Sequence, residues 1–429
     1  MIYRILTLIN IFLINLQFAF AQTDIRISGP ANGFPVALPV MCDAGGGSDA
    51  ARNIPETIIR DLKISGLFQV IDPKTYVEAP GKCTTPESIA FTDWSVIGAE
   101  GLVKGDISVS GGQLQAKLYL FDVQRKQAVV GKMYSGDLRD SSKIAHRFAN
   151  EIVKFFTGEP GIFGSQVAFV SKVGRFKELF IMDSDGQNVR QMTEDVGIVA
   201  SPSWSPSGDK VIYTSYRSRT PELYWLPPEG GAPRQVTNRA GLEISPKYSP
   251  DGSKIAVAIS AEGDTNLALM DLRGSVTQYL TRGGQIDVSP SWSPDGSRIA
   301  FCSNRGGGPQ IYIMSASGGE ATRISYTGST YCTSPAWSPK GDKIAFVCLQ
   351  GGPQIFMIDA QGGQAVQLTF GGRNEDVSWS PDGRYLIFSS DLGRGAKRIV
   401  IQNTNGAAAF PISSGRSEDS QPAWSPRVE

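Results

Sequence analysis

Short apolar runs separated by Ser-Pro-Asp-Gly-type turns fill the chain from residue 166 to its end. Residues 289–301 show the unit best. They predict a short strand, a tight turn and a returning strand, because Pro presets φ in the turn and Gly accepts a positive φ. The turn recurs behind an aromatic residue at steps of 44, 44, 45, 42 and 45 residues, at Trp204, Tyr248, Trp292, Trp337, Trp379 and Trp424. A period of this length, built from short strands, is typical of a β-propeller.

The phase of the repeat predicts how the ring closes. Each aromatic turn is followed by three further apolar strands. The repeat region opens at residues 167–171, which match the second strand of a unit, and closes at residues 422–425, which match the first. We therefore predict an all-β six-bladed β-propeller over residues 163–429, closed by pairing of its first and last strands. Such closure removes sheet edges that would otherwise invite aggregation. The repeated aromatic residue is predicted to pack between neighbouring blades.

Residues 22–160 carry a different pattern. Apolar residues at helical spacing predict one helix through Ile54, Ile58 and Leu62 and a second over residues 142–156. Alternating or continuous apolar runs predict strands, over residues 24–28, 35–41, 68–71, 102–109, 114–123 and 128–134. Two helices against a mixed sheet of about five strands make a small α/β N-terminal domain, with residues 158–161 as the linker.

The first 21 residues predict a secretory signal peptide. Arg4 precedes a largely apolar run over residues 5–18, and Ala19-Phe20-Ala21 has the form of a cleavage site. The alternative is a membrane anchor, but the apolar run is short beside the roughly 20 residues that a span needs. We expect export to the periplasm with cleavage of this segment.

Composition excludes some kinds of chemistry and leaves others open. Lys plus Arg and Asp plus Glu are both 41, so no basic excess favours nucleic acid. The single His, the missing Gly-x-Ser-x-Gly elbow and the missing Cys-x-x-Cys spacing argue against catalysis, a metal or a cofactor. Of the five Cys, Cys42 could pair with Cys83, and Cys332 could pair with Cys348 across a hairpin, leaving Cys302. The alternative is that all five are packed thiols.

One set of polar positions suggests a binding site. Five residues before each blade aromatic, the chain enters the innermost strand beside the central channel. These positions hold Val199, Glu243, Asp287, Cys332, Asn374 and Asp419, and Glu375, Asp376 and Glu418 are adjacent. Three acids at equivalent positions are expected to give one channel mouth a negative field, suited to a basic peptide or protein or to a weakly held cation. The alternative is a set of solvated turn carboxylates.

The combination of signal, α/β domain and Trp-Ser-Pro-Asp-Gly-type propeller resembles the TolB family of the Tol-Pal envelope system. The repeat also occurs in propellers attached to prolyl-oligopeptidase-like peptidases, but no hydrolase domain follows here. The last repeat, residues 422–426, ends the chain as it does in the family. The mature start, with Thr23, Asp24, Ile25, Arg26 and Ile27 before a Pro/Gly-bearing loop and residues 35–40, looks like the family's N-terminus.

The resemblance implies a monomeric, non-enzymatic scaffold between the inner-membrane TolQ-TolR-TolA complex and the outer-membrane lipoprotein Pal. It would serve outer-membrane invagination during cell division and outer-membrane integrity. It implies TolA binding by residues 22–33 and Pal binding at the channel mouth, here Glu243, Asp287, Asn374, Glu375, Asp376, Glu418 and Asp419. Two rival hypotheses are an exported hydrolase or lyase acting at the channel and a surface adhesion propeller.

Overall fold

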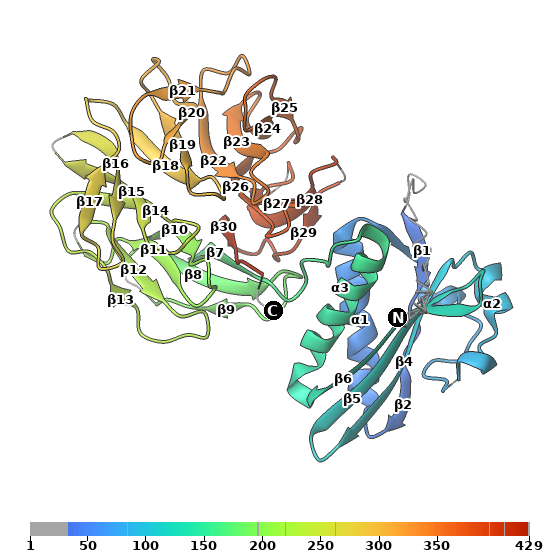
Figure 1. Cartoon of the computed structure of the whole chain (residues 1–429). Coiled ribbons are helices and arrows are strands. Elements are labelled where there is room, and N and C mark those ends of the chain that lie inside the picture. The colour runs from blue at the N-terminus through green and yellow to red at the C-terminus, as the bar shows by residue number, and fades with distance from the viewer. Residues whose placement is uncertain are drawn as a thin grey trace, which may run out of the picture.

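The chain folds into an α/β part and a β-propeller that lie side by side (Figure 1). The structure, a computed structural model, describes residues 33–427 except 84, 195, 196, 219, 262, 394 and 407. The predicted signal peptide, residues 1–21, and the strand predicted over 24–28 lie outside the described residues.

The α/β part is a six-stranded sheet in the order β3-β1-β4-β5-β6, with β2 also paired to β4. Its strands are β1 (Phe34–Ala37), β2 (Cys42–Gly45), β3 (Phe68–Val70), β4 (Gly101–Ser110), β5 (Gln113–Asp122) and β6 (Gln127–Asp137). The sequence predicts one strand over residues 35–41, but β1 ends at Ala37, residues 38–41 are not in a strand, and β2 begins at Cys42. Pro39, which has no N–H to give to a ladder, lies in the break between them.

Helices cover both faces of this sheet. The helices are α1 (Ser48–Ser65), α2 (Phe91–Val96) and α3 (Ser141–Thr157), with short 3₁₀ turns η1 (Pro73–Thr75), η2 (Pro86–Ser88) and η3 (Leu138–Asp140). The predicted apolar stripe of α1 packs with α3 into one core, and α2 packs on the opposite face. Gly66 ends α1 in the left-handed conformation, with φ 66°.

The propeller consists of six four-stranded antiparallel sheets. Five are formed by consecutive strands: β10 (Val199–Trp204), β11 (Val211–Ser215), β12 (Glu222–Leu226) and β13 (Arg234–Gln235); β14 (Leu242–Tyr248), β15 (Ile255–Ala261), β16 (Asp264–Met270) and β17 (Val276–Tyr279); β18 (Asp287–Trp292), β19 (Arg298–Ser303), β20 (Gln310–Ser315) and β21 (Ala321–Arg323); β22 (Cys332–Trp337), β23 (Lys343–Leu349), β24 (Pro353–Asp359) and β25 (Val366–Gln367); β26 (Asn374–Trp379), β27 (Tyr385–Ser390), β28 (Arg398–Asn403) and β29 (Phe410–Pro411).

The sixth blade joins the two ends of the repeat region. It combines β30 (Ser420–Trp424) with β7 (Gln166–Val173), β8 (Phe176–Asp183) and β9 (Arg190–Gln191). Ala423 is opposite Ala168, and Trp424 is opposite Val167. The predicted blade number and the predicted closure are therefore confirmed.

Most of the repeated Trp residues tie one blade to the one before it. The indole N–H of Trp204 donates to Ala423 O (2.9 Å), that of Trp292 to Lys247 O (3.2 Å) and that of Trp379 to Ala336 O (2.8 Å). Trp337 and Trp424 differ, because the indole N–H of Trp337 donates to Gly341 O in its own turn and that of Trp424 donates to Ser165 Oγ. These bonds support the predicted packing between blades.

Both possible disulfides are formed. Cys42 is bonded to Cys83 in the α/β part, and Cys332 to Cys348 across β22 and β23. Cys302 is a buried free thiol. Cys332 and Cys348 are direct partners in the strand register, as counting back from the turn predicts.

The α/β part and the propeller share a continuous core. Buried side chains of α1 and α3 cluster with Ile387 and Trp424 of the propeller. The Tyr385 hydroxyl donates to Ser65 O (3.0 Å), and the Arg384 guanidinium donates to Pro160 O (2.7 Å). Among the described helices, none has the length and apolar character needed to cross a bilayer.

Candidate functional site

A regular bulge shapes the channel wall. In each innermost strand one residue adopts a positive φ of 52–58°, and the strand register shifts around it. These residues are Ser201, Ser245, Ser289, Ser334, Asp376 and Gln421. A β-bulge of this kind re-aims the neighbouring side chains. The bulge residues and the residues directly after them in each strand line a central cavity of about 230 Å³. The last residues of the innermost strands and the Ser-Pro turns that follow line a second cavity of about 370 Å³.

Exposed apolar side chains lie at the end of the strands opposite to these turns. Ile198 directly precedes β10, and its carbonyl accepts a hydrogen bond from the Tyr216 N–H (2.8 Å). The Tyr331 carbonyl accepts one from the Leu349 N–H (3.0 Å) in the same way, just before β22. We call the set the apolar rim; its members are 37–79% exposed and are Ile198, Tyr216, Ile286, Tyr326, Tyr331, Leu349, Phe370 and Leu392.

The three acids predicted to charge this mouth are buried instead. Asp287 is fully buried, and the Arg305 guanidinium donates to both of its oxygens (3.1 and 3.2 Å). The Asp419 carboxylate accepts hydrogen bonds from the hydroxyls of Ser171 and Ser413 (both 2.6 Å). Burial raises its pKa.

Glu243 is likewise buried, with a pKa raised by loss of water and with Arg239 Nη1 3.6 Å from its carboxylate. The position is a buried one in every blade, because Val199 and Cys332 occupy it with no exposure at all. The expected negative field is therefore not created by these three acids. Their side chains are held inside the blades.

The other predicted mouth residues are distributed more widely. Asn374 is buried and bonded to Gln354 and Ser390. Glu375 is partly exposed between Arg373 and Lys397, and Glu418 is exposed. Asp376 is the one acid of the set on the channel wall. Its carboxylate accepts from Ser389 Oγ (3.1 Å) and from the Gln421 N–H (3.2 Å), and burial raises its pKa.

The N-terminal candidates fall beyond the part of the chain that the structure describes. Thr23, Asp24, Ile25, Arg26 and Ile27 all precede residue 33.

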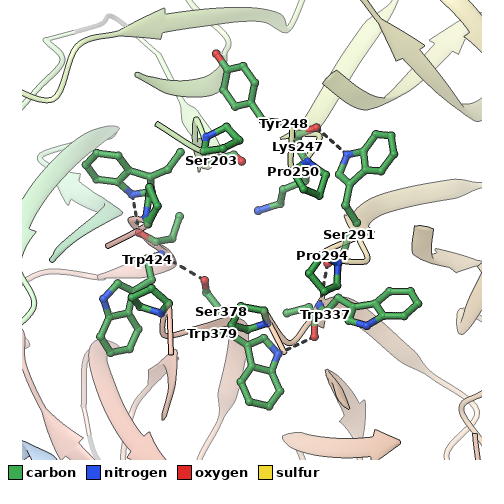
Figure 2. A pocket seen from close by; sticks show the side chains of 18 of the residues that line it. Ser203, Lys247, Tyr248, Pro250, Ser291, Pro294, Trp337, Ser378, Trp379 and Trp424 are labelled. Carbon is green, nitrogen blue, oxygen red and sulfur yellow. Dashed lines mark hydrogen bonds between the residues drawn. The ribbon is translucent and has the colours of Figure 1, made fainter. Parts of the chain in front are cut away.

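Two features of the channel were not found from the sequence. One is the apolar rim, whose members lie in connections or, for Leu349, at the last position of a strand, rather than in the repeat motif. The other is Lys247, whose side chain reaches toward the centre of the turn-side cavity (Figure 2). Aligning the six innermost strands would have revealed it, because the equivalent positions hold only Ser or Ala.

A buried cluster of charges joins the two parts of the molecule. His146 Nδ1 lies 2.7 Å from Asp61 Oδ2, and Arg60 donates to Asp185 Oδ2 at 2.8 Å. Asp61, His146 and Asp185 offer ligand atoms within 4.8 Å of one another, which is a spacing that a metal could use. Two basic and two acidic side chains balance here, so the charges of the cluster are compensated by ion pairs within the protein.

In the buried His146–Asp61 pair, each side chain shifts the pKa of the other. Burial alone lowers the pKa of His146, but the charge of Asp61 and the hydrogen bond to it raise that pKa to about 8 overall. Burial raises the pKa of Asp61 to about 6, against the opposing influence of His146. The pair is therefore charged on both sides near neutral pH.

Comparison with known proteins gives the family. Residues 153–428 match the model of the TolB beta propeller domain, and residues 23–129 match that of the TolB amino-terminal domain. Curated relatives include the Tol-Pal system protein TolB of Anaeromyxobacter dehalogenans strain 2CP-C, 37% identical over 174 residues, covering 41% of this chain and 40% of the relative. That of Syntrophotalea carbinolica is 36% identical over 203 residues, covering 44% of each. These alignments thus span less than half of the relatives' length.

A solved structure matches over almost the whole chain. The crystal structure of TolB from Acinetobacter baumannii superimposes with a TM-score of 0.82 and 25% identity, covering 93% of this chain and 98% of that one. Since the propeller model alone matches more than half of the residues, the chain belongs to the TolB family.

Proposed function

We propose that this TolB-family chain is a non-enzymatic periplasmic scaffold of the Tol-Pal system. In this proposal it links the inner-membrane TolQ-TolR-TolA complex with the outer-membrane lipoprotein Pal, and so serves outer-membrane invagination and integrity. The curated relatives carry the name Tol-Pal system protein TolB, which supports the assignment. The proposal includes a mature protein that begins near residue 22, after removal of a signal peptide.

The apolar rim is the observation that carries the docking part of the proposal. Exposed apolar side chains that gather at one site mark protein interaction surfaces, whereas single ones do not. Here they belong to several blades and lie at the same end of the strands. Phe370 and Tyr326 are 79% and 68% exposed, so they are available to a partner without any rearrangement. We assign Pal to this mouth, with the partly exposed Glu375 and the exposed Glu418 as polar residues beside it.

The proposed TolA contact is the mature N-terminal segment, residues 22–33. It rests on the family resemblance of Thr23 to Ile27 and is independent of the rim. The two contacts therefore predict separable defects.

The test measures binding of purified, lipid-free Pal from the same organism to the mature chain. The double variant Phe370→Ser/Tyr326→Ser should bind at least about tenfold more weakly, since anchor side chains of an interface are each worth more than 1 kcal/mol. The matched control is Val96→Ser/Met133→Ser, which removes two equally exposed apolar side chains (81% and 70%) from the α/β part. It should bind Pal normally.

Deleting residues 22–33 should abolish binding of TolA and leave Pal binding intact. Equal Pal affinity in the rim variant and its control would remove Pal from this mouth. Failure of the intact protein to bind either partner would overturn the scaffold proposal itself. Charge reversal at Glu243, Asp287 and Asp419 would be a poor test, because it would place unpaired charges inside the blades.

A further inference from the structure

One ring of channel residues consists only of hydrogen-bond donors and small apolar groups. It lies two residues beyond the bulge in each innermost strand, where the cavity of about 370 Å³ is lined by the Ser-Pro turns. We call it the donor ring; its members are Ser203, Lys247, Ser291, Ala336, Ser378 and Ala423. Figure 2 shows its labelled members around the opening, with the Lys247 side chain directed into it.

The serine hydroxyls of the donor ring are free to donate a hydrogen bond to a ligand. Ser291 Oγ accepts the Trp337 N–H (2.9 Å), and Ser378 Oγ accepts the Trp424 N–H (3.3 Å). A hydroxyl that accepts in this way keeps one O–H to donate. Within the described residues, neither these two hydroxyls nor that of Ser203 donates to a protein acceptor.

Lys247 is half-buried, and it lacks the oppositely charged partner that buried charges such as Asp287 and Lys104 have. Asp287 pairs with Arg305 and Lys104 with Glu78, whereas no carboxylate of the described chain lies within 4 Å of Lys247 Nζ. Loss of surrounding water lowers the pKa of Lys247 to about 8. The other titratable group on this channel wall is Asp376, three blades away, and Ser389 and the Gln421 N–H already bind its carboxylate.

We infer that the donor ring binds a carboxylate, with Lys247 supplying the charge and Ser203, Ser291 and Ser378 supplying hydroxyl donors. A cation that has lost part of its hydration is expected to be paired, and the described residues supply no carboxylate within 4 Å of Lys247 Nζ. The carboxylate belongs either to a small free acid or to an acidic side chain of a peptide that enters from the turn end. The site lies at the opposite end of the innermost strands from the apolar rim, so it does not depend on Pal docking.

Two probes separate these sources, each with a neutral partner. Succinate, with succinamide as control, represents a free acid. The blocked peptide acetyl-Gly-Asp-Gly-amide, with its Asn analogue as control, represents a side chain. Binding of each to the mature protein is measured by calorimetry at pH 6.5. We expect at least one acid to bind, and at least tenfold more tightly than its neutral analogue.

Variants locate the binding at Lys247. Lys247→Gln should weaken it at least tenfold, and Lys247→Arg, which keeps the charge, should retain it within about threefold. Lys254→Gln, an exposed lysine at the turn of the same blade, should change nothing. Binding should also fall at least tenfold at pH 10, where Lys247 is neutral, and a melting curve confirms that each variant is folded.

The binding measurements show whether the donor ring binds a carboxylate and which kind of molecule carries it. Preference for succinate identifies a free acid as the ligand class, and preference for the Asp peptide identifies a side chain. Absence of binding by both acids overturns the inference, as does binding that Lys247→Gln leaves unchanged. Neither result would affect the assignment of Pal to the rim, which the Phe370→Ser/Tyr326→Ser variant tests separately.

Discussion

At the scale of single residues, Gly186 is the described glycine whose backbone surroundings leave the least room for a side chain. It lies in the turn between β8 and β9 with a φ of +82°, and a Cβ attached to it would lie 2.0 Å from the carbonyl oxygen of Ile412 in the neighbouring blade. The glycine therefore meets two requirements, a left-handed conformation and a close approach between blades.

We expect Gly186→Ala to destabilise the protein far more than Gly174→Ala. Gly174 also has a positive φ (+61°), but no atom lies within 4 Å of the place that a methyl group would take, so its variant suffers only the left-handed strain of about 1–2 kcal/mol. Gly186→Ala adds overpacking of about 1–3 kcal/mol or more. Urea unfolding of both variants measures the difference. Equal losses would mean that the two blades can separate at this point without cost.

The acids of the innermost strands show what sequence reasoning can reach at this scale. Counting back five residues from each aromatic found the start of these strands, because the repeat fixes the spacing. It did not find that the side chains are buried. The sequence does contain a sign of this burial, since the same position holds the apolar residues Val199 and Cys332 in two blades. The charges of Glu243, Asp287 and Asp419 nevertheless favoured an interpretation in which the position is exposed to solvent. Their partners, such as Arg305, come from other strands, and the sequence does not order them in space.

At the scale of elements, the Cys332–Cys348 disulfide fastens the first two strands of one blade directly below the rim. The bonded cysteines are register partners, and the next pair outward is Tyr331 with Leu349. The disulfide closes a loop with a sequence separation of 16.

Replacing both cysteines by Ala should lower the free energy of unfolding by about 3 kcal/mol, the entropy that a loop of this size regains in the unfolded chain. Urea unfolding with and without dithiothreitol measures it. The wild-type protein should lose stability in reductant, and the double variant should lose less, because only Cys42–Cys83 remains to be reduced. Cys302→Ala serves as the control, since it keeps both disulfides and should keep the full response to reductant. A double variant as stable as wild type would contradict the prediction.

Helices and strands with a strongly periodic apolar pattern could be predicted from the sequence, but the positions where a strand is interrupted could not. The helix over 142–156 and the three long strands of the α/β part lie where the apolar pattern indicates them. The end of β1 at Ala37 and the start of a separate strand, β2, at Cys42 depend on Pro39 and on pairing of both strands with β4, which is distant in the chain. Local pattern carries no information about such pairing.

At the scale of the whole molecule, ring closure depends on one short strand at the end of the repeat region. Deleting residues 420–429 would leave β7 without its inner neighbour and would remove the buried Trp424. Loss of a buried Trp side chain costs about 3–5 kcal/mol by itself. We therefore expect the melting temperature to fall by about 10 °C or more.

A synthetic peptide of residues 418–429 should restore part of the lost stability by refilling the sheet edge. The same peptide with Trp424→Ala should restore less. Thermal unfolding and size-exclusion chromatography report the result, and a truncated protein that melts like the intact chain would refute the importance of the closing strand.

The junction between the two parts could not be read from the sequence, yet it makes the sharpest prediction about pH. The only His of the chain showed no catalytic context, and its partner Asp61 lies on another helix. In the folded protein the pKa of His146 is about 8, above its ordinary value of 6.5. A raised histidine pKa stabilises the fold fully below pH 6.5, and this contribution is lost as the pH rises through 8.

The free energy of unfolding should therefore fall by about 2 kcal/mol between pH 6.5 and 8.5, since 1.36 kcal/mol corresponds to one pKa unit. His146→Gln should abolish this slope and should cost about 3 kcal/mol near pH 6.5, because it leaves Asp61 buried without a charged partner. Asp61→Asn/His146→Gln removes both charges and should regain much of that loss. The slope cannot come from Lys247, whose lowered pKa makes stability rise with pH above 8. A wild-type slope that survives in His146→Gln would mean that the His146–Asp61 pair is not the source of the pH dependence.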